Sequence, residues 1–409
     1  LFSILLNKFF ASKILYHSVE LENDWFSICS ILYLLNKLWS FRMEKIYKMK
    51  TDIFSEFELD KRGSMRRHDE RDTMFARMNY RRNTSAYDDY YSRNPDKKHI
   101  DDQLRSMPEL CSPGVPTYDP IDSNVAIANF KFLENIRHLA EGQQSTSKVS
   151  VKADEITQRL KDLTLYYGAK HVGIARMQDY HYYTHRGRLL EHYGERINEF
   201  LPYGIAFTVE MKREAVEKAP TTPEIIESSR AYVEAAIIGM ELAYFIRELG
   251  YRARVHMDAN YLVITPLVAW DAGIGVIGRH GLIITPHYGA SVRLGVVTTD
   301  IPLVPDDRMK VDIFRFCSIC RLCAITCPGR AIPEGEPECI DGELRWRIDQ
   351  EKCYTFWRKV GTDCGVCLKK CPFGKGIDIL DLEKSEYSSD PYKLLEKHLN
   401  TTASRSQES

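Results

Sequence analysis

The chain has 409 residues, of which 44% are hydrophobic and 28% charged, and its formal net charge is -1. This length predicts two or three domains, the hydrophobic content excludes a wholly disordered chain, and the balanced charge offers no basic excess for nucleic acid. Eleven cysteines are present, and nine of them lie between Cys317 and Cys371. Such crowding in a long chain indicates metal ligation instead of a disulfide framework, and it argues against a cofactor-free hydrolase.

Residues 1–42 form a leader of uncertain status, because their composition differs from that of the following chain, and Met43 is a candidate start. The apolar run at residues 26–35 is about ten residues long, whereas a membrane-spanning helix needs roughly 20. Acidic residues precede this run, which argues against a secretory signal peptide. We therefore expect no transmembrane helix and, for the sequence as written, a cytoplasmic protein.

Residues 43–150 are predicted to form an N-terminal arm that wraps the core. Between positions 60 and 102 the arm is dense in charged residues and tyrosines and shows little periodicity, so we expect it to be extended. It has more aromatic residues than a purely solvating tail usually carries. Prolines between positions 108 and 120 predict a loop-rich connection to the next region.

Residues 151–305 alternate between helical and strand patterns. An apolar stripe of helical period starts at Val151 and ends at Gly168, and a longer helix begins at Pro223 and ends at Gly250. Apolar runs predict strands at residues 172–175, 200–211, 251–257 and 291–300. We therefore expect an α/β (α+β) domain in which helices are layered on a sheet.

Two cysteine motifs follow, and both end in Cys-Pro. The first is Cys317-x2-Cys320-x2-Cys323-x3-Cys327, and the second is Cys353-x10-Cys364-x2-Cys367-x3-Cys371. Thiolates suit iron–sulfur clusters, and in two-cluster ferredoxins the cysteine before the proline binds the other cluster. One [4Fe–4S] cluster is therefore assigned to Cys317, Cys320, Cys323 and Cys371. The other takes Cys327, Cys364, Cys367 and a fourth ligand, most simply Cys353.

Cys339 competes for this fourth position, since it also lies between the motifs. A zinc ribbon is the alternative metal site, but the C-x2-C-x2-C-x3-C-P spacing fits paired C-x2-C knuckles poorly. The isolated Cys29 and Cys111 are expected to be free thiols. Two clusters that exchange ligands must lie close together, so this region is predicted to carry electrons to a partner protein or to a cofactor of the same chain.

With these motifs, residues 65–380 resemble the corrinoid-dependent reductive dehalogenases. Besides the two cysteine blocks, the resemblance is carried by "SSRAYVEAAIIGMELAYFIRELGY" and "PLVAWDAGIGVIGRHGLIITPHYGASVRLGVVTTD". It implies a nitroreductase-like, cobalamin-binding domain in residues 151–305, a bacterial ferredoxin-like domain in residues 306–385 and a tail in residues 386–409. It also implies base-off cobalamin that is reduced to Co(I) by two [4Fe–4S] clusters and removes halide from an organohalide. The same resemblance favours Cys353 over Cys339.

In that family a tyrosine supplies the proton, and an arginine stabilises the phenolate. By position in the motifs, Tyr232 matches the tyrosine and Arg293 matches the arginine. Asn260 matches a polar residue of the substrate pocket, with Asp258 as the competing register. A phenol has an ordinary pKa of about 10, so it is a useful acid only where a cation favours its ionised form. Without the resemblance, these positions would be read as core, surface or turn residues.

A glycine-rich stretch contains Gly273-x-Gly275-x-x-Gly278, and Gly281 follows it. As a dinucleotide fingerprint the pattern is weak, because a strand-like run follows it instead of a helix. We expect these glycines to let the backbone approach the corrinoid, with His287 near the nucleotide tail. A solvent-exposed loop histidine is the alternative reading of His287.

Two other functions stay open. Epoxyqueuosine reductase, a tRNA-modifying corrinoid iron–sulfur enzyme, has a similar glycine-rich core, and Asp258 falls where that family keeps an acidic proton donor. The spacer before Cys364, the "CPFGKG" ending and the long aromatic arm argue against it. A non-catalytic iron–sulfur electron-transfer protein is the second alternative, although it would leave the α/β domain without a role.

The resemblance also implies partners. A low-potential electron donor is expected, either a ferredoxin or flavodoxin or a membrane electron chain, and nucleic acid is not. Respiratory members are exported by a twin-arginine signal and held at the outer face of the cytoplasmic membrane by a small anchor protein. Neither Arg66-Arg67 nor Arg81-Arg82 precedes an apolar stretch, so export would need a segment missing from the N-terminus. Formation of a homodimer is left open.

Overall fold

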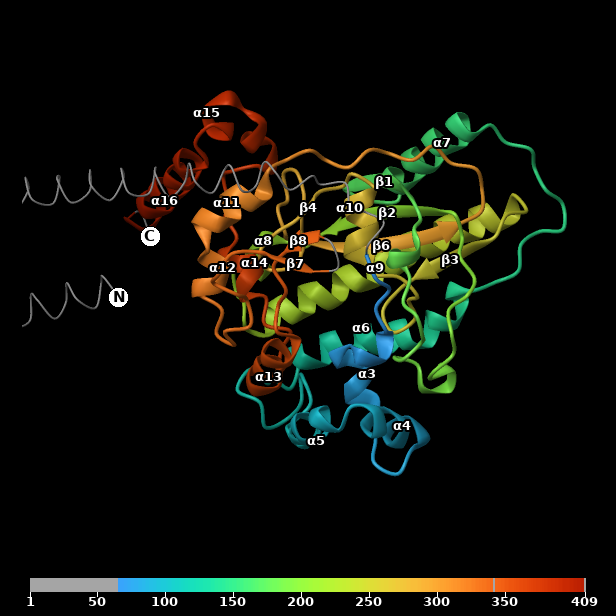
Figure 1. Ribbon diagram of the computed structural model, residues 1–409, viewed down its shortest axis with the longest axis horizontal. Helices are drawn as coiled ribbons and strands as arrows, with labels where there is room; N and C mark the ends of the chain where they lie inside the picture. The colour runs from blue at the N-terminus through green and yellow to red at the C-terminus, as the bar shows by residue number, and fades with distance from the viewer. Residues whose placement is uncertain (1–64, 341–342, 408–409) are drawn as a thin grey trace, which may run out of the picture. The chain divides into compact units, whose positions relative to one another are not determined.

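The computed structural model describes residues 65–340 and 343–407, which lie in one unit of the chain (Figure 1). The expected leader and Cys29 fall outside these residues. Within the part of the chain that is described, no helix is both long and apolar enough to cross a membrane.

The prediction of an extended arm is wrong, because this region consists largely of short helices. Three of them have only six to nine residues, so their helical period does not stand out in the sequence. Thr73 and Thr84 cap the first two by accepting hydrogen bonds from backbone N–H groups. The helices are α3 (Met74–Asn79), α4 (Ser85–Arg93), α5 (Lys98–Ser106) and α6 (Asp122–Ile136).

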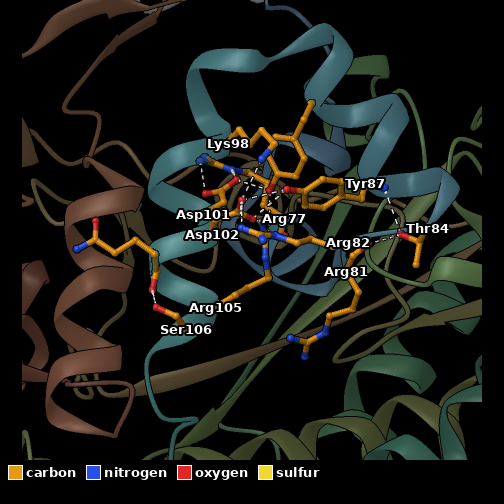
Figure 2. Close-up of polar contacts among 12 residues, drawn as sticks. Arg77, Arg81, Arg82, Thr84, Tyr87, Lys98, Asp101, Asp102, Arg105 and Ser106 are labelled. Atoms are coloured by element: carbon orange, nitrogen blue, oxygen red, sulfur yellow. Dashed lines mark hydrogen bonds and ion pairs between the residues drawn. The ribbon is translucent and has the colours of Figure 1, made fainter.

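A buried ion pair holds the arm helices together. Arg77 donates to both carboxylate oxygens of Asp101 at 2.9 and 2.6 Å, and Tyr91 donates to Asp101 at 2.8 Å. Figure 2 shows the neighbouring Asp102 within the same network of arginine, lysine and tyrosine side chains. Arg77 also pairs with Glu351 at 2.9 Å, on helix α13 (Gln350–Val360). The arm is thereby tied to the cysteine-rich region.

The central sheet has four strands in the order β1-β2-β6-β3, and every neighbouring pair is antiparallel. Gly295 faces Phe207 across strands β2 and β6, and a Cβ at Gly295 would lie 2.3 Å from the phenyl ring. A glycine is therefore needed at this position of close approach. The strands, all near predicted positions, are β1 (His171–Arg176), β2 (Tyr203–Glu210), β3 (Ala253–His256) and β6 (Val292–Thr299).

Helices cover both faces of this sheet. Alternate residues of a strand point to opposite faces, so Phe207 packs in one core with helices α7 and α9, while Ala206 packs in a second core with helix α10. Figure 1 shows α9 running along the sheet, and its start at the predicted proline is confirmed. The helices are α7 (Ala153–Tyr166), α9 (Thr222–Glu248) and α10 (Thr265–Asp271). The predicted mixed class of helices and sheet is therefore confirmed.

The cysteine-rich region consists of short helices and a hairpin. Arg321 and Gly365 adopt left-handed backbone, with φ of +54° and +67°, at the starts of helices α12 and α14. These turns reverse the chain directly after Cys320 and Cys364. The elements are α11 (Ile313–Cys320), α12 (Leu322–Ile325), β7 (Glu338–Ile340), β8 (Glu343–Arg345), α14 (Val366–Lys370), α15 (Ser385–Ser388) and α16 (Pro391–Gln407). Earlier short elements are α8 (Arg213–Val216), β4 (Val276–Ile277) and β5 (Ile283–Ile284).

Candidate functional site

One set of four cysteines, here the first cysteine group, lines a single pocket. Its members are Cys317 and Cys320 on α11, Cys323 on α12 and Cys371 after α14. Burial raises the pKa of Cys320 to about 11 and that of Cys323 to about 12. The pKa of Cys371 is raised by burial and then by the other three thiols. The structure thus brings together the four cysteines that were predicted to share one cluster.

The second cysteine group consists of Cys327, Cys353, Cys364 and Cys367. Burial and then Cys327 raise the pKa of Cys353 to about 11, and burial raises that of Cys364 to about 12, with smaller effects of Cys353 and Cys327. Cys367 is influenced by Cys353 and Cys364 and also by Cys323 of the first group, so the groups are neighbours. Cys339 is exposed on β7. Cys353 thus interacts with Cys327, Cys364 and Cys367, and its role as the fourth ligand stays a prediction.

The two groups suit iron–sulfur clusters chemically. A buried thiol holds its proton tightly, and only a strong local positive charge, such as that of iron, favours the thiolate. Among the residues that the structure describes, no three His, Cys, Asp or Glu side chains are placed to hold a single metal ion. Two sets of four buried or partly buried thiols are the ligand complement of two [4Fe–4S] clusters.

Tyr232 and Arg293 lie against each other beside the sheet. Tyr232 is on α9 and Arg293 on β6, and the guanidinium carbon lies 4.1 Å from the centre of the phenol ring. Arg293 is the largest influence on the pKa of Tyr232 and lowers it. Burial and two carboxylates, Asp258 and Asp363, outweigh this effect, so the pKa is raised above its ordinary value. Tyr232 is therefore a protonated phenol at neutral pH, with a cation ready to stabilise its anion.

A chain of hydrogen bonds runs from this pair to the second cysteine group. Arg293 donates to Ser228 Oγ at 2.6 Å, and Ser228 donates to Asp363 Oδ2 at 2.5 Å, next to Cys364. Burial and then Asp363 raise the pKa of Glu224 well above its ordinary value. Three buried polar atoms here, Arg293 Nε, Asp363 Oδ1 and Glu224 Oε2, have no hydrogen-bond partner among the described residues.

These hydrogen bonds were not predicted from the sequence. The only sequence signal was that Ser228 precedes Tyr232 by one helical turn, which places both side chains on the same face of the helix. Unpartnered buried polar atoms are rare in native proteins and call for a partner. A bound polar group between α9 and the second cysteine group would provide one.

Asp258, and not Asn260, lies near Tyr232. Asp258 is 3.6 Å from Arg188 Nη2, and it raises the pKa of both Tyr232 and Tyr261. The amide of Asn260 accepts from Arg254 at 2.7 Å and donates to the Arg137 carbonyl at 2.8 Å. The structure therefore brings the competing register, Asp258, to the candidate site, together with Arg188, which sequence reasoning did not identify.

The glycines of the predicted corrinoid loop make close contacts within the protein. A Cβ at Gly273 or Gly275 would lie 2.3 or 2.2 Å from a backbone carbonyl oxygen, and one at Gly278 would lie 2.5 Å from Ile284. Gly281 has φ +75°. His287 is 73% exposed and pairs with Asp378 at 2.7 Å. Protein packing accounts for these residues, and their contact with a cofactor stays a prediction.

The chain is similar in sequence to known proteins of two kinds. No protein-family model matches the chain. It is 36% identical over 176 residues to the tetrachloroethene reductive dehalogenase of Sulfurospirillum multivorans, a match that covers 41% of this chain and 34% of that protein. It is 30% identical over 153 residues to the epoxyqueuosine reductase of Bacillus anthracis, covering 34% of this chain and 37% of that protein. The matched region thus spans about a third of these relatives.

Solved structures agree on the fold. The catabolic reductive dehalogenase NpRdhA, in complex with 3-bromo-4-hydroxybenzoic acid, matches with a TM-score of 0.64 at 22% identity over 84% of this chain and 47% of its own. A reductive dehalogenase structure described in terms of B12-dependent dehalogenation matches with a TM-score of 0.62 at 24% identity. The chain spans about half the length of these proteins and shares their fold over that part.

Proposed function

Because the chain is a relative of the reductive dehalogenases, we propose that it removes halide from an organohalide with the help of cobalamin and two [4Fe–4S] clusters. The carbon–halogen bond breaks, the halide leaves, and the carbon gains two electrons and one proton. The electrons come from a low-potential donor, which is a ferredoxin, a flavodoxin or a membrane electron chain. Bound cobalamin supplies a strongly reducing cobalt centre, and the clusters supply its electrons.

Tyr232 is the proposed proton donor. It holds its proton at the phenol oxygen until the reacting carbon takes it, and Arg293 then stabilises the phenolate. The observation that carries the proposal is the position of this pair, 4.1 Å apart and linked through Ser228 to the carboxylate next to Cys364. A proton source and an electron source thereby meet at one place. A purely structural tyrosine would not need this link to the cysteines.

The proposed cofactor sites follow the same arrangement. The first and second cysteine groups each hold one cluster, and the corrinoid lies between α9 and the second group, near the unpartnered atoms of Arg293 and Glu224. Residues 151–305 are proposed to be a nitroreductase-like cobalamin domain and residues 306–385 a ferredoxin-like domain. A homodimer and a membrane anchor protein remain options for its assembly.

The test is anaerobic reconstitution of the full chain with iron, sulfide and cobalamin. A panel of brominated and chlorinated phenols and alkenes is then supplied with a low-potential reductant, and released halide is measured by ion chromatography. We expect release from at least one compound, dependent on both the reductant and cobalamin. No release from any compound, together with turnover of epoxyqueuosine tRNA, would overturn the proposal.

Epoxyqueuosine reduction is the second candidate, and one observation favours it. Asp258 acts on the pKa of Tyr232 and is itself 3.6 Å from Arg188, so a carboxyl group is available at the site. Asp258→Asn separates the two candidates. If Asp258 supplies the proton, this substitution abolishes reduction, whereas halide release that depends on Tyr232 is only weakened.

A further inference from the structure

A buried guanidinium lies against the first cysteine group. Arg279 follows strand β4 and is 1% exposed. It lines the same pocket as Cys317, Cys320, Cys323 and Cys371, and its Nε donates to the Cys317 carbonyl at 3.1 Å. The guanidinium carbon lies 4.3 Å from the centre of the Trp346 ring. Trp346 and the carbonyls hold the cation in one position.

The charge of Arg279 has no local counter-ion. Its other hydrogen bonds, both 2.7 Å long, go to the neutral carbonyls of Pro333 and Gly335. No ion pair found among the described residues involves Arg279, and Glu336, a carboxylate that influences it, is exposed. Lys375, a second cation near Cys371, is ion-paired with Glu217 and is therefore compensated.

Burial of a lone cation is unfavourable unless an anion lies nearby. A cluster held by four thiolates is such an anion. Reduction by one electron adds one further unit of negative charge, and the attraction to a fixed cation grows in the low dielectric of the interior. An uncompensated guanidinium therefore stabilises the reduced cluster more than the oxidised one.

We propose that Arg279 raises the reduction potential of the cluster bound by the first cysteine group above that of the second. The inference rests on the cluster assignment in the proposed function. Asp363 and Glu224 lie beside the second group, where they act on Cys353 and Cys364 respectively. The first cluster would thus store an electron readily, and the second would pass it on at a lower potential.

The experiment is a potentiometric titration of the reconstituted full chain with dithionite, monitored by electron paramagnetic resonance. In Arg279→Gln, the ratio of reduced to oxidised first cluster at a fixed potential falls about tenfold, which for one electron is about 59 mV. The second cluster is unchanged. Arg279→Lys keeps the cation and stays close to the unsubstituted protein. Arg321→Gln is the matched control, because Arg321 lines the same pocket but is 39% exposed and paired with Glu334.

An unchanged first potential in Arg279→Gln, or an equal shift in Arg321→Gln, would overturn the inference. If Arg279→Gln fails to bind the cluster, the inference is tested by comparing the reduction potentials of the two clusters in the unsubstituted protein. Cys371→Ser identifies the signal of the first cluster, and that signal must have the higher potential of the two; a lower one contradicts the role of Arg279. If the unsubstituted protein shows no [4Fe–4S] signals at all, the proposed function itself fails, which is a separate result.

Discussion

The two cysteine groups contain four thiols each and echo each other in sequence, yet their surroundings differ. The first group lies beside an isolated buried cation, Arg279. The second lies beside Asp363, whose hydrogen bond to Ser228 leads to Arg293 and Tyr232. Motif spacing determines which thiols meet, whereas residues from distant segments determine the charge that each cluster would experience. We therefore propose that the cluster of the first group stores an electron and that the cluster of the second group delivers electrons to the reaction site.

The largest effect is expected from loss of a ligand in the second group. Cys353→Ser should lower bound iron by up to roughly half and abolish halide release, because one of two four-iron clusters would lose a ligand. Iron and sulfide analysis with a halide assay measures both quantities. Cys339→Ser is the matched control and should change neither, since Cys339 is exposed on β7. The reverse pattern would assign Cys339 as the ligand.

The next effect concerns the arm that supports the second group. Arg77→Leu leaves Asp101, which is 0% exposed, without its positively charged partner, so the free energy of unfolding should fall by about 3–5 kcal/mol. Anaerobic urea unfolding of the holoprotein checks this, with the cluster signals followed in parallel. Since Arg77 also pairs with Glu351 on the helix that carries Cys353, the second cluster should be lost first.

Arg82→Leu provides the control for this prediction. Arg82 is 70% exposed and pairs with Asp102, so its loss should lower the free energy of unfolding far less than the loss of Arg77. Equal destabilisation by the two substitutions would show that the buried pair has no special role.

A smaller effect, on the reduction potential of the second cluster, is expected from substitution of Asp363, the carboxylate beside the second group. Asp363→Asn removes a negative charge near Cys353 and Cys364, so the potential of the second cluster should rise, opposite in sign to the change in Arg279→Gln. We expect about a tenfold change in the reduced fraction, or about 59 mV. Asp300→Asn, at the end of β6, should leave both potentials unchanged. A fall in the second potential would contradict the electrostatic difference between the groups.

The smallest effect lies in the sheet, away from both groups. Burial and then Arg254 lower the pKa of His256 well below its ordinary value, and its ring bonds to Thr298 at 2.9 Å. The unfolded chain then binds a proton before the folded one, so this stabilisation is complete above about pH 6.5 and is lost as pH falls. At pH 5.5 the loss should approach about 1.4 kcal/mol.

Urea unfolding at pH 7.5, 6.5 and 5.5 checks this dependence. In His256→Gln the change of unfolding free energy with pH should be smaller, while in the control His192→Gln, which replaces a partly exposed histidine outside the sheet, it should stay the same. An unchanged slope in His256→Gln would assign the acid sensitivity to other groups.

Cysteine spacing, a local property, predicted which four thiols meet in the pocket of the first group, and the resemblance named Tyr232 and Arg293, which lie against each other. It did not separate Asp258 from Asn260, because Ala259 between them adopts left-handed backbone with φ +60° and the two side chains enter different networks. Arg279 and Asp363 also went unnoticed. Their importance depends on burial and on partners from distant segments, which no local pattern records.

The arm illustrates the same limit. Its short helices lack a visible period, and their stability comes from pairs such as Arg77–Asp101 that form only after the chain has folded. The prediction of an extended arm failed because it was based on the high density of charged residues and the lack of periodicity.

Halide release by two tyrosine variants tests the central claim most directly. Tyr232 and Tyr244 lie on the same helix, and each has an arginine near its ring, but Tyr244 is 47% exposed and its arginine is Arg247. With unchanged cluster and cobalamin content, Tyr232→Phe should lower the rate by about 10²–10⁴-fold, and Tyr244→Phe should not change it. Halide release at the full rate by Tyr232→Phe would contradict the account.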